Sequence, residues 1–302
     1  MKGLGKYEIL YDLPEGEYAA GEVGGIRTRT IRAGDSLEVE CFPITRISRE
    51  AERERLRRRS SPAQEALNRR RSADRMRRLA EANFGEGDWA LHLTINYGIY
   101  DLSQVKASEV WARCEKLGLP TDEAGARRVI RAYIKRVKRA MAKKGRDARE
   151  LKYLYVMEST AEPRDSDPHP LPMRFHFHGI FHAPGMTREE LEALWGLGYA
   201  NCDRLDLRDN GLSKLAQYLT KQRKFTRRWA HSKNLVPPKE TVSDRKVSRR
   251  RAALVARDVQ TFGAEIFEAI YPGYQVTQPI RVVYSDFVAG AYIYARLRRV
   301  RS

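Results

Sequence analysis

Residues 174–181, Arg-Phe-His-Phe-His-Gly-Ile-Phe, constrain the fold more than any other stretch of this chain. In an extended strand, alternate side chains point to opposite faces of the sheet. The aromatic and imidazole side chains therefore separate into two sets, with Phe175, Phe177 and Phe181 on one face and His176 and His178 on the other. Three aromatic rings on one face bury a large apolar area, which predicts that this face contacts the core. The two imidazoles lie side by side on the opposite face, roughly 6–7 Å apart at their Cα atoms.

Two adjacent imidazoles are suited to a divalent metal ion, which usually takes a third protein ligand. Glu158 is the candidate, because it ends the apolar, strand-prone run 151–158. If that run pairs antiparallel with the His strand, Glu158 lies near the start of the His strand. A Glu-His-His set favours Mg²⁺ or Mn²⁺. His92, on the outward side of a predicted strand at 89–96, is an alternative third ligand, and an ordinary polar strand face remains the simpler interpretation of the His pair.

A third motif lies between residues 211 and 221, where leucines recur at helical spacing. Tyr218 and Lys221 are three residues apart and share one face of the predicted helix. A helical tyrosine is often a core residue, so this motif gains weight only beside the other two.

Together, the His pair, the upstream carboxylate and the Tyr-x-x-Lys resemble the motifs of the HUH endonucleases. Within that superfamily the chain resembles the rolling-circle replication initiators (Rep proteins) of bacterial plasmids and phages, similar to the filamentous-phage gene II proteins. Residues 78–84 and 93–96 resemble that family's entry into its first strand. Residues 227–235 resemble its segment after the catalytic tyrosine. The resemblance covers residues 75–240.

The resemblance implies a function and a set of partners. It implies metal-dependent nicking of single-stranded origin DNA, with Glu158, His176 and His178 as ligands of one Mg²⁺ or Mn²⁺ and Tyr218 as nucleophile. The products are a 5′-phosphotyrosyl link and a free 3′-OH that primes a host polymerase, and strands can later be rejoined. Lys221 contacts the phosphate or eases loss of the phenol proton. The chain has no phosphate loop of the Gly-x-x-x-x-Gly-Lys type, so a host helicase is expected to unwind the duplex.

The charge of the chain agrees with a polyanionic partner. The formal net charge is +18, and basic residues concentrate in the windows 46–78, 127–152 and 221–257. Such windows favour contacts with DNA phosphates, although any single one is commonly a solvated surface. The residues expected to contact DNA are Arg223, Lys224, Arg227, Arg228, Trp229 and His92. Trp229 is equally well interpreted as a core anchor.

The same sequence predicts a soluble protein in the cytoplasm of a bacterial host. Cys41, Cys114 and Cys202 are odd in number and widely spaced, which indicates a reducing compartment and no zinc pattern. There is no signal-like apolar segment at the start and no run long enough to cross a bilayer, so no membrane partner is expected.

The order of predicted elements favours an α+β fold. Between residues 89 and 221 it is strand, helix, helix, strand, strand, helix, strand, helix. This fits an antiparallel β-sheet with helices on one face, the split β-α-β arrangement of HUH, ferredoxin-like or RRM-like domains. We expect a β element and an Arg-rich helical segment at 1–83 and the nuclease core at 84–225. A basic extension that packs on the core or extends it is expected at 226–302, partly irregular as far as residue 260.

Two other functions share these motifs. A related HUH relaxase or transposase has the same site and a different substrate, and a non-catalytic DNA-binding regulator could keep the fold alone. The chain has one Tyr-x-x-Lys where two-tyrosine initiators have a pair. A single-tyrosine enzyme would need a second subunit, and hence a homodimer, or another residue that activates water, to end a round.

Overall fold

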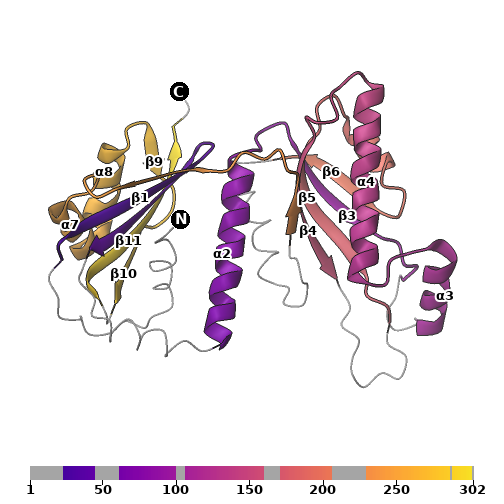
Figure 1. The fold of residues 1–302 in the computed structure, drawn as a ribbon, viewed down its shortest axis with the longest axis horizontal. Coiled ribbons are helices and arrows are strands. Elements are labelled where there is room, and N and C mark those ends of the chain that lie inside the picture. Colours follow the sequence, from indigo (N-terminus) through magenta and orange to yellow (C-terminus); the bar gives the residue numbers. More distant parts are fainter. Residues whose placement is uncertain are drawn as a thin grey trace. The chain divides into compact units, whose positions relative to one another are not determined.

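The computed structural model describes residues 23–44, 61–99, 106–159, 171–205, 229–285 and 288–300. These residues form a mixed α+β protein with two antiparallel sheets. Its contacts divide the chain into two compact units, one of them Ser72–Val236, the other Met1–Arg71 together with Pro237–Ser302. We call the first the central unit and the second the terminal unit; Figure 1 shows the elements of each.

The central unit is built on a five-stranded antiparallel sheet, in the order β6-β3-β5-β4-β7. Its strands are β3 (Trp89–Thr94), β4 (Lys152–Ser159), β5 (Phe175–His182), β6 (Ala200–Arg204) and β7 (Trp229–His231). The predicted His strand is therefore the middle strand of the sheet. Paired strands on both sides fix its register, and with it the face to which each of its side chains points.

One face of this sheet, the Phe face, carries Phe175, Phe177 and Phe181, all at most 2% exposed. It packs against α3 (Ala107–Leu117) and α4 (Glu123–Lys143), as Figure 1 shows for α4. Helix α4 begins at Asp122, whose side chain accepts a hydrogen bond from the Gly125 amide. Its buried side chains recur at helical spacing and include Ile130, Tyr133, Ile134, Val137 and Met141. The predicted strands and helices of this layer are thus present.

The opposite face, the His face, carries Glu158, His176 and His178 and is not entirely free of helices. Helix α2 (Ser61–Glu81) packs on it through Ala73, Met76, Leu79 and Ala80. Beneath these side chains lie the apolar residues Leu154, Val156 and Ile180 of the His face. The expectation of helices on one face only is therefore wrong. The reason is that half of the His face is apolar and needs cover, while its other end is polar.

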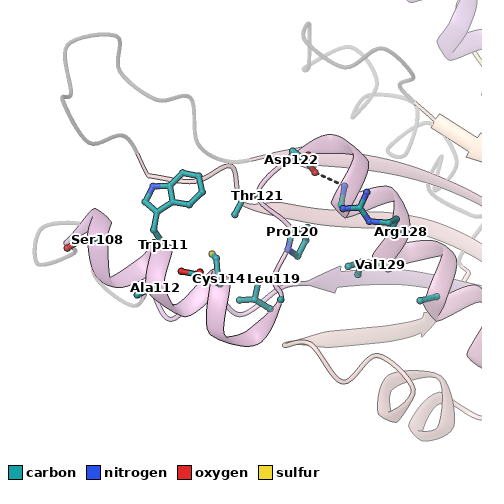
Figure 2. A pocket seen from close by; sticks show the side chains of 14 residues that line it. Ser108, Trp111, Ala112, Cys114, Leu119, Pro120, Thr121, Asp122, Arg128 and Val129 are labelled. Atoms are coloured by element: carbon teal, nitrogen blue, oxygen red, sulfur yellow. Dashed lines mark hydrogen bonds between the residues drawn. The ribbon is translucent and has the colours of Figure 1, made fainter.

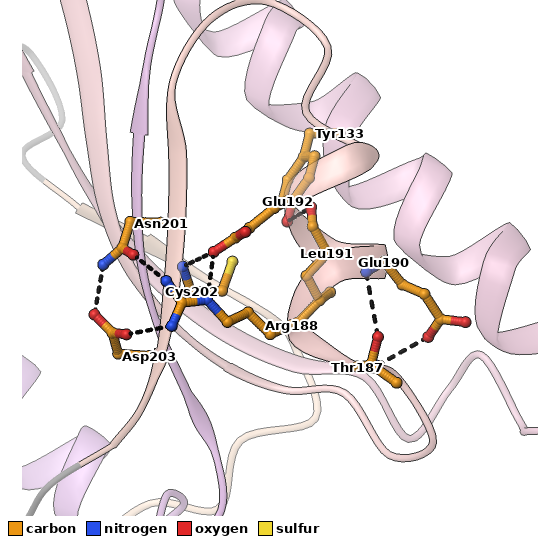
Figure 3. A network of polar contacts seen from close by, with 9 residues as sticks. All are labelled: Tyr133, Thr187, Arg188, Glu190, Leu191, Glu192, Asn201, Cys202 and Asp203. Atoms are coloured by element: carbon orange, nitrogen blue, oxygen red, sulfur yellow. Dashed lines mark hydrogen bonds and ion pairs between the residues drawn. The ribbon is translucent and has the colours of Figure 1, made fainter.

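A short helix, α5 (Arg188–Ala193), connects β5 to β6 and is stabilised by polar contacts (Figure 3). Six residues are too few for an isolated helix to be stable in water. Thr187 and Glu190 form a capping box at its start. The Glu192 carboxylate accepts hydrogen bonds from Arg188 and from the Cys202 amide of β6. These contacts tie the helix to the edge strand.

The terminal unit contains a six-stranded antiparallel sheet made from both ends of the chain. Its hairpin of β1 (Gly25–Ala33) and β2 (Ser36–Ile44) pairs with later strands on both sides. Those strands are β8 (Lys239–Ser243), β9 (Tyr274–Val276), β10 (Arg281–Ser285) and β11 (Val288–Arg299). Helices α7 (Arg249–Arg257) and α8 (Val259–Ile270) contribute apolar side chains to its core.

This second sheet bears on two expectations. The segments expected as an N-terminal element at 1–83 and a C-terminal extension at 226–302 supply strands to one common sheet, because β11 pairs with β2 and β8 pairs with β1. The region 223–260, expected to be partly irregular, contains β8 and α7 together with turns and irregular segments in its described part. In the described part of the chain, each helix is either too short or too polar to cross a membrane.

Candidate metal centre

Register brings the three expected metal ligands together on the His face. In the β4–β5 pair Glu158 lies directly opposite His176, and His178 follows two residues later on the same face. The Nε2 atom of His176 lies 2.9 Å from Glu158 Oε2, and that of His178 lies 4.0 Å from the same oxygen. One ligand atom from each residue lies within 4.8 Å of the others. Three side chains thus converge on one small volume.

The surroundings of Glu158 fit a bound cation. The residue is 8% exposed, and its Oε1 atom is buried without a hydrogen-bond partner among the described residues. Burying a carboxylate with an unsatisfied oxygen destabilises the folded state by roughly several kcal/mol, unless a positive charge compensates it. Two imidazole nitrogens and a carboxylate oxygen are a donor set common to divalent metal sites. The group could therefore hold a metal ion, and its chemistry does not select which one.

His92 lies against the metal ligands rather than among them. It is the cross-strand partner of His178, and the two rings stack 4.4 Å apart at an interplanar angle of 8°. Burial, and then the charge of His176, lower the pKa of the His92 imidazole below its usual value. A neutral ring packed flat against His178 restricts the orientations of that ligand. The alternative in which His92 replaces Glu158 is not favoured, because Glu158 itself points at both imidazoles.

His182 continues the His face but belongs to a separate pair. Its Nδ1 atom lies 2.7 Å from Oδ1 of Asp88, a residue that is 9% exposed. The other oxygen of Asp88 accepts a hydrogen bond from the Gly85 amide. Asp88 directly precedes β3, and no sequence pattern had marked it as a partner of a histidine. It orients His182 at the far end of the strand from His176.

Trp229 is placed as a packing residue of β7. Its indole Nε1 donates a hydrogen bond to Ser72 Oγ at 3.0 Å, and the ring packs against the apolar cluster below α2. This favours the core-anchor interpretation over base stacking. The predicted nucleophile and its neighbours lie outside the described residues; they are Tyr218, Lys221, Arg223, Lys224, Arg227 and Arg228.

A hollow of about 990 Å³ lies elsewhere in the central unit, between α3 and the start of α4 (Figure 2). It is lined by apolar and polar side chains that include Trp111, Leu119, Asp122 and Arg128. None of the metal-centre residues contributes to it. Among the described residues, no group of three possible metal ligands lines this hollow.

Comparison with known proteins yields no match, whether with family models, with curated proteins or with solved structures. A functional assignment therefore has to be argued from the chemistry of the site and from the motifs of the chain.

Proposed function

We propose that this chain is a metal-dependent, site-specific DNA endonuclease of the HUH class that initiates rolling-circle replication. The observation that carries the proposal is the convergence of Glu158 of β4 with His176 and His178 of β5, the middle strand of an antiparallel sheet. The HUH resemblance implies this ligand set and this strand. The distances between the ligand atoms are independent of the resemblance, because they follow from strand register.

The chemistry assigned to the chain's own residues is a transesterification. Glu158, His176 and His178 would hold one Mg²⁺ or Mn²⁺. The bound ion would act as a Lewis acid and polarise a phosphoryl oxygen of the scissile phosphate. The Tyr218 oxygen attacks the scissile phosphorus, and the bond from phosphorus to the 3′ oxygen breaks. The phenol proton is lost and the departing 3′ oxygen gains one, so the step needs no oxidant or reductant. A free phenol has a pKa of about 10, so Tyr218 needs a group that promotes loss of its proton. Lys221 is the candidate for this role.

The outcome of the step explains why a tyrosine suits replication. A covalent 5′-phosphotyrosyl link preserves the energy of the broken phosphodiester bond, so the strand can be rejoined without a further energy source. The free 3′-OH would be extended by a host polymerase while a host helicase opens the duplex. The net charge of +18 supports a DNA substrate for this chemistry.

The deciding experiment is a covalent-adduct assay. Full-length protein is incubated with single-stranded DNA from the replicon that encodes it, with Mn²⁺, and resolved on an SDS gel. We expect an SDS-resistant protein–DNA band that disappears with EDTA, with Tyr218→Phe and with His176→Ala. Tyr199→Phe is the matched control, because Tyr199 is 63% exposed and its hydrogen bonds run through its backbone.

Two results would contradict the proposal. A band that survives Tyr218→Phe places the nucleophile elsewhere. Absence of a band on verified origin DNA, with tight binding retained, favours a non-catalytic DNA-binding regulator.

A further inference from the structure

The outer surface of α4 carries a row of cations that have no acidic partner among the described residues. We call Arg128, Arg131, Lys135, Lys138, Arg139 and Lys143 the cation row. All six are exposed, and none makes an ion pair with a described residue. No acidic residue occurs between residues 124 and 144. At about 100° per residue, these positions lie opposite the buried stripe of Ile130, Tyr133 and Val137.

Other basic residues of the same region have clear structural partners. Arg127 pairs with Glu123, Arg136 donates to the backbone carbonyls of Leu194 and Trp195, and Lys144 pairs with Glu190. These three account for the cations that the fold itself uses. The cation row is what remains, and it contributes mutual repulsion rather than stability. Such an arrangement is complementary to a polyanion.

We propose that the cation row binds the phosphate backbone of duplex DNA, at a surface separate from the metal centre. Helix α4 packs on the Phe face, whereas Glu158, His176 and His178 lie on the His face. The sheet and the helix, itself about 10 Å across, therefore separate the two surfaces. A strand cleaved at the metal centre cannot at the same point contact the cation row. The row thus serves a second DNA segment.

Two features favour a duplex over a single strand. Binding of single strands relies on aromatic side chains that stack on bases. The outer surface of α4 has no such side chain, because Tyr133 is the one aromatic residue of this helix and is 0% exposed. The row belongs to one continuous helix and is about 22 Å long from residue 128 to residue 143. A duplex offers one phosphate charge per about 1.7 Å of its axis. The expected contact is consequently independent of base sequence.

A membrane surface fits this helix less well. Amphipathic helices that bind membranes insert large apolar side chains. On the outer surface of α4 the exposed apolar residues are alanines, Ala124, Ala132 and Ala142. The large apolar side chains face the sheet and are already buried.

The test compares three full-length variants in EDTA, so that cleavage is absent. Arg131→Gln, Lys135→Gln and Arg139→Gln are combined in the row variant, since glutamine keeps the helix. A second variant exchanges Arg and Lys at the same three positions and keeps the charge. The matched control combines Arg32→Gln, Lys106→Gln and Lys116→Gln, which remove three exposed charges outside the three basic windows of the chain. Affinity for a short duplex of mixed sequence is measured by fluorescence anisotropy at several salt concentrations.

We expect the row variant to bind the duplex at least about tenfold more weakly at 0.1 M salt. Its slope of log affinity against log salt should fall by about 2.7, or 0.9 per lost phosphate contact. The charge-preserving variant should bind like the natural protein. Unchanged affinity in the row variant overturns the proposal, as does an equal loss in the control. Tighter row-dependent binding to anionic vesicles or to polyglutamate would reject DNA as the occupant.

This inference does not depend on the cleavage chemistry. His176→Ala should lose the covalent adduct and retain duplex binding. If the row variant binds the duplex normally, the cation-row proposal is wrong while adduct formation by the natural protein is unaffected. The two proposals can therefore be contradicted independently.

Discussion

At the scale of single residues, Glu158 is where stability and function oppose each other. Its carboxylate is buried, and one of its oxygens has no hydrogen-bond partner among the described residues, which is unfavourable in the absence of a cation. Its other oxygen contacts His176 Nε2 at 2.9 Å. Neutral imidazoles can coordinate a metal only through a nitrogen that carries no proton, so binding a cation exchanges this hydrogen bond for coordination. The group is arranged to gain from a metal ion.

Glu158→Gln should separate these two effects. Without metal, we expect the free energy of unfolding to stay equal or to rise slightly, because a buried charge is removed. With Mn²⁺ at about 100 times its dissociation constant, the natural protein should gain about 2.7 kcal/mol and the variant almost none. Urea unfolding with and without Mn²⁺ measures both quantities. Glu115→Gln, an exposed position on α3, is the control, and an equal Mn²⁺ response in both variants would remove Glu158 from the site.

At the scale of elements, the sequence predicted what depends on local periodicity. The alternation of Phe and His identified β5 and its two faces, and the apolar spacing of Ile130, Tyr133 and Val137 identified α4. The proximity of Glu158 to His176 also followed, because one antiparallel pairing was enough to place it. These features need no knowledge of distant contacts.

The rest depends on pairings between segments far apart in the chain. Nothing local in β2 reveals that β11, some 250 residues later, is its neighbour. Met76, Leu79 and Ala80 are buried in α2, but nothing local in this Arg-rich segment indicates which surface they contact. Asp88 was missed because its partnership with His182 arises only when β3 and β5 pair.

The turn before β6 gives a prediction at this scale. A Cβ atom on Gly198 would lie 2.6 Å from the Thr94 carbonyl oxygen and 2.7 Å from the Asn96 amide nitrogen. Both are backbone atoms, at the last residue of β3 and just after it, and they cannot move aside without disturbing the sheet. Gly198→Ala should therefore destabilise the central unit by more than about 3 kcal/mol, as strain and overpacking add.

Gly196 supplies the matched comparison. It also has a positive φ, of 67°, but a Cβ atom there would meet nothing within 4 Å. Gly196→Ala should cost only about 1 kcal/mol, the backbone term alone. Urea unfolding of both variants tests the difference. Equal losses would mean that the close approach at Gly198 is not what requires glycine.

At the scale of the whole molecule, each unit has a core of its own. The central unit contains the clusters around Phe177 and around Met76, whereas the terminal unit contains the cluster around Leu37 and Phe267. No residue is shared between these clusters. Units that each bury their own apolar core commonly unfold in separate steps, so a single two-state transition is not expected.

Heat unfolding followed by calorimetry should therefore show two transitions, and each should respond to its own substitution. Val137→Ala, in the central unit, should lower the midpoint temperature of one transition, and Leu37→Ala, in the terminal unit, should lower that of the other. Both side chains are 0% exposed, so each substitution should reduce the stability of its unit by on the order of 1–5 kcal/mol. Mn²⁺ should raise only the transition that Val137→Ala lowers, because the metal ligands lie in the central unit. If Mn²⁺ instead raised the transition that Leu37→Ala lowers, the metal would not bind in the central unit. If both substitutions shifted one common transition, the two cores would unfold as one cooperative body.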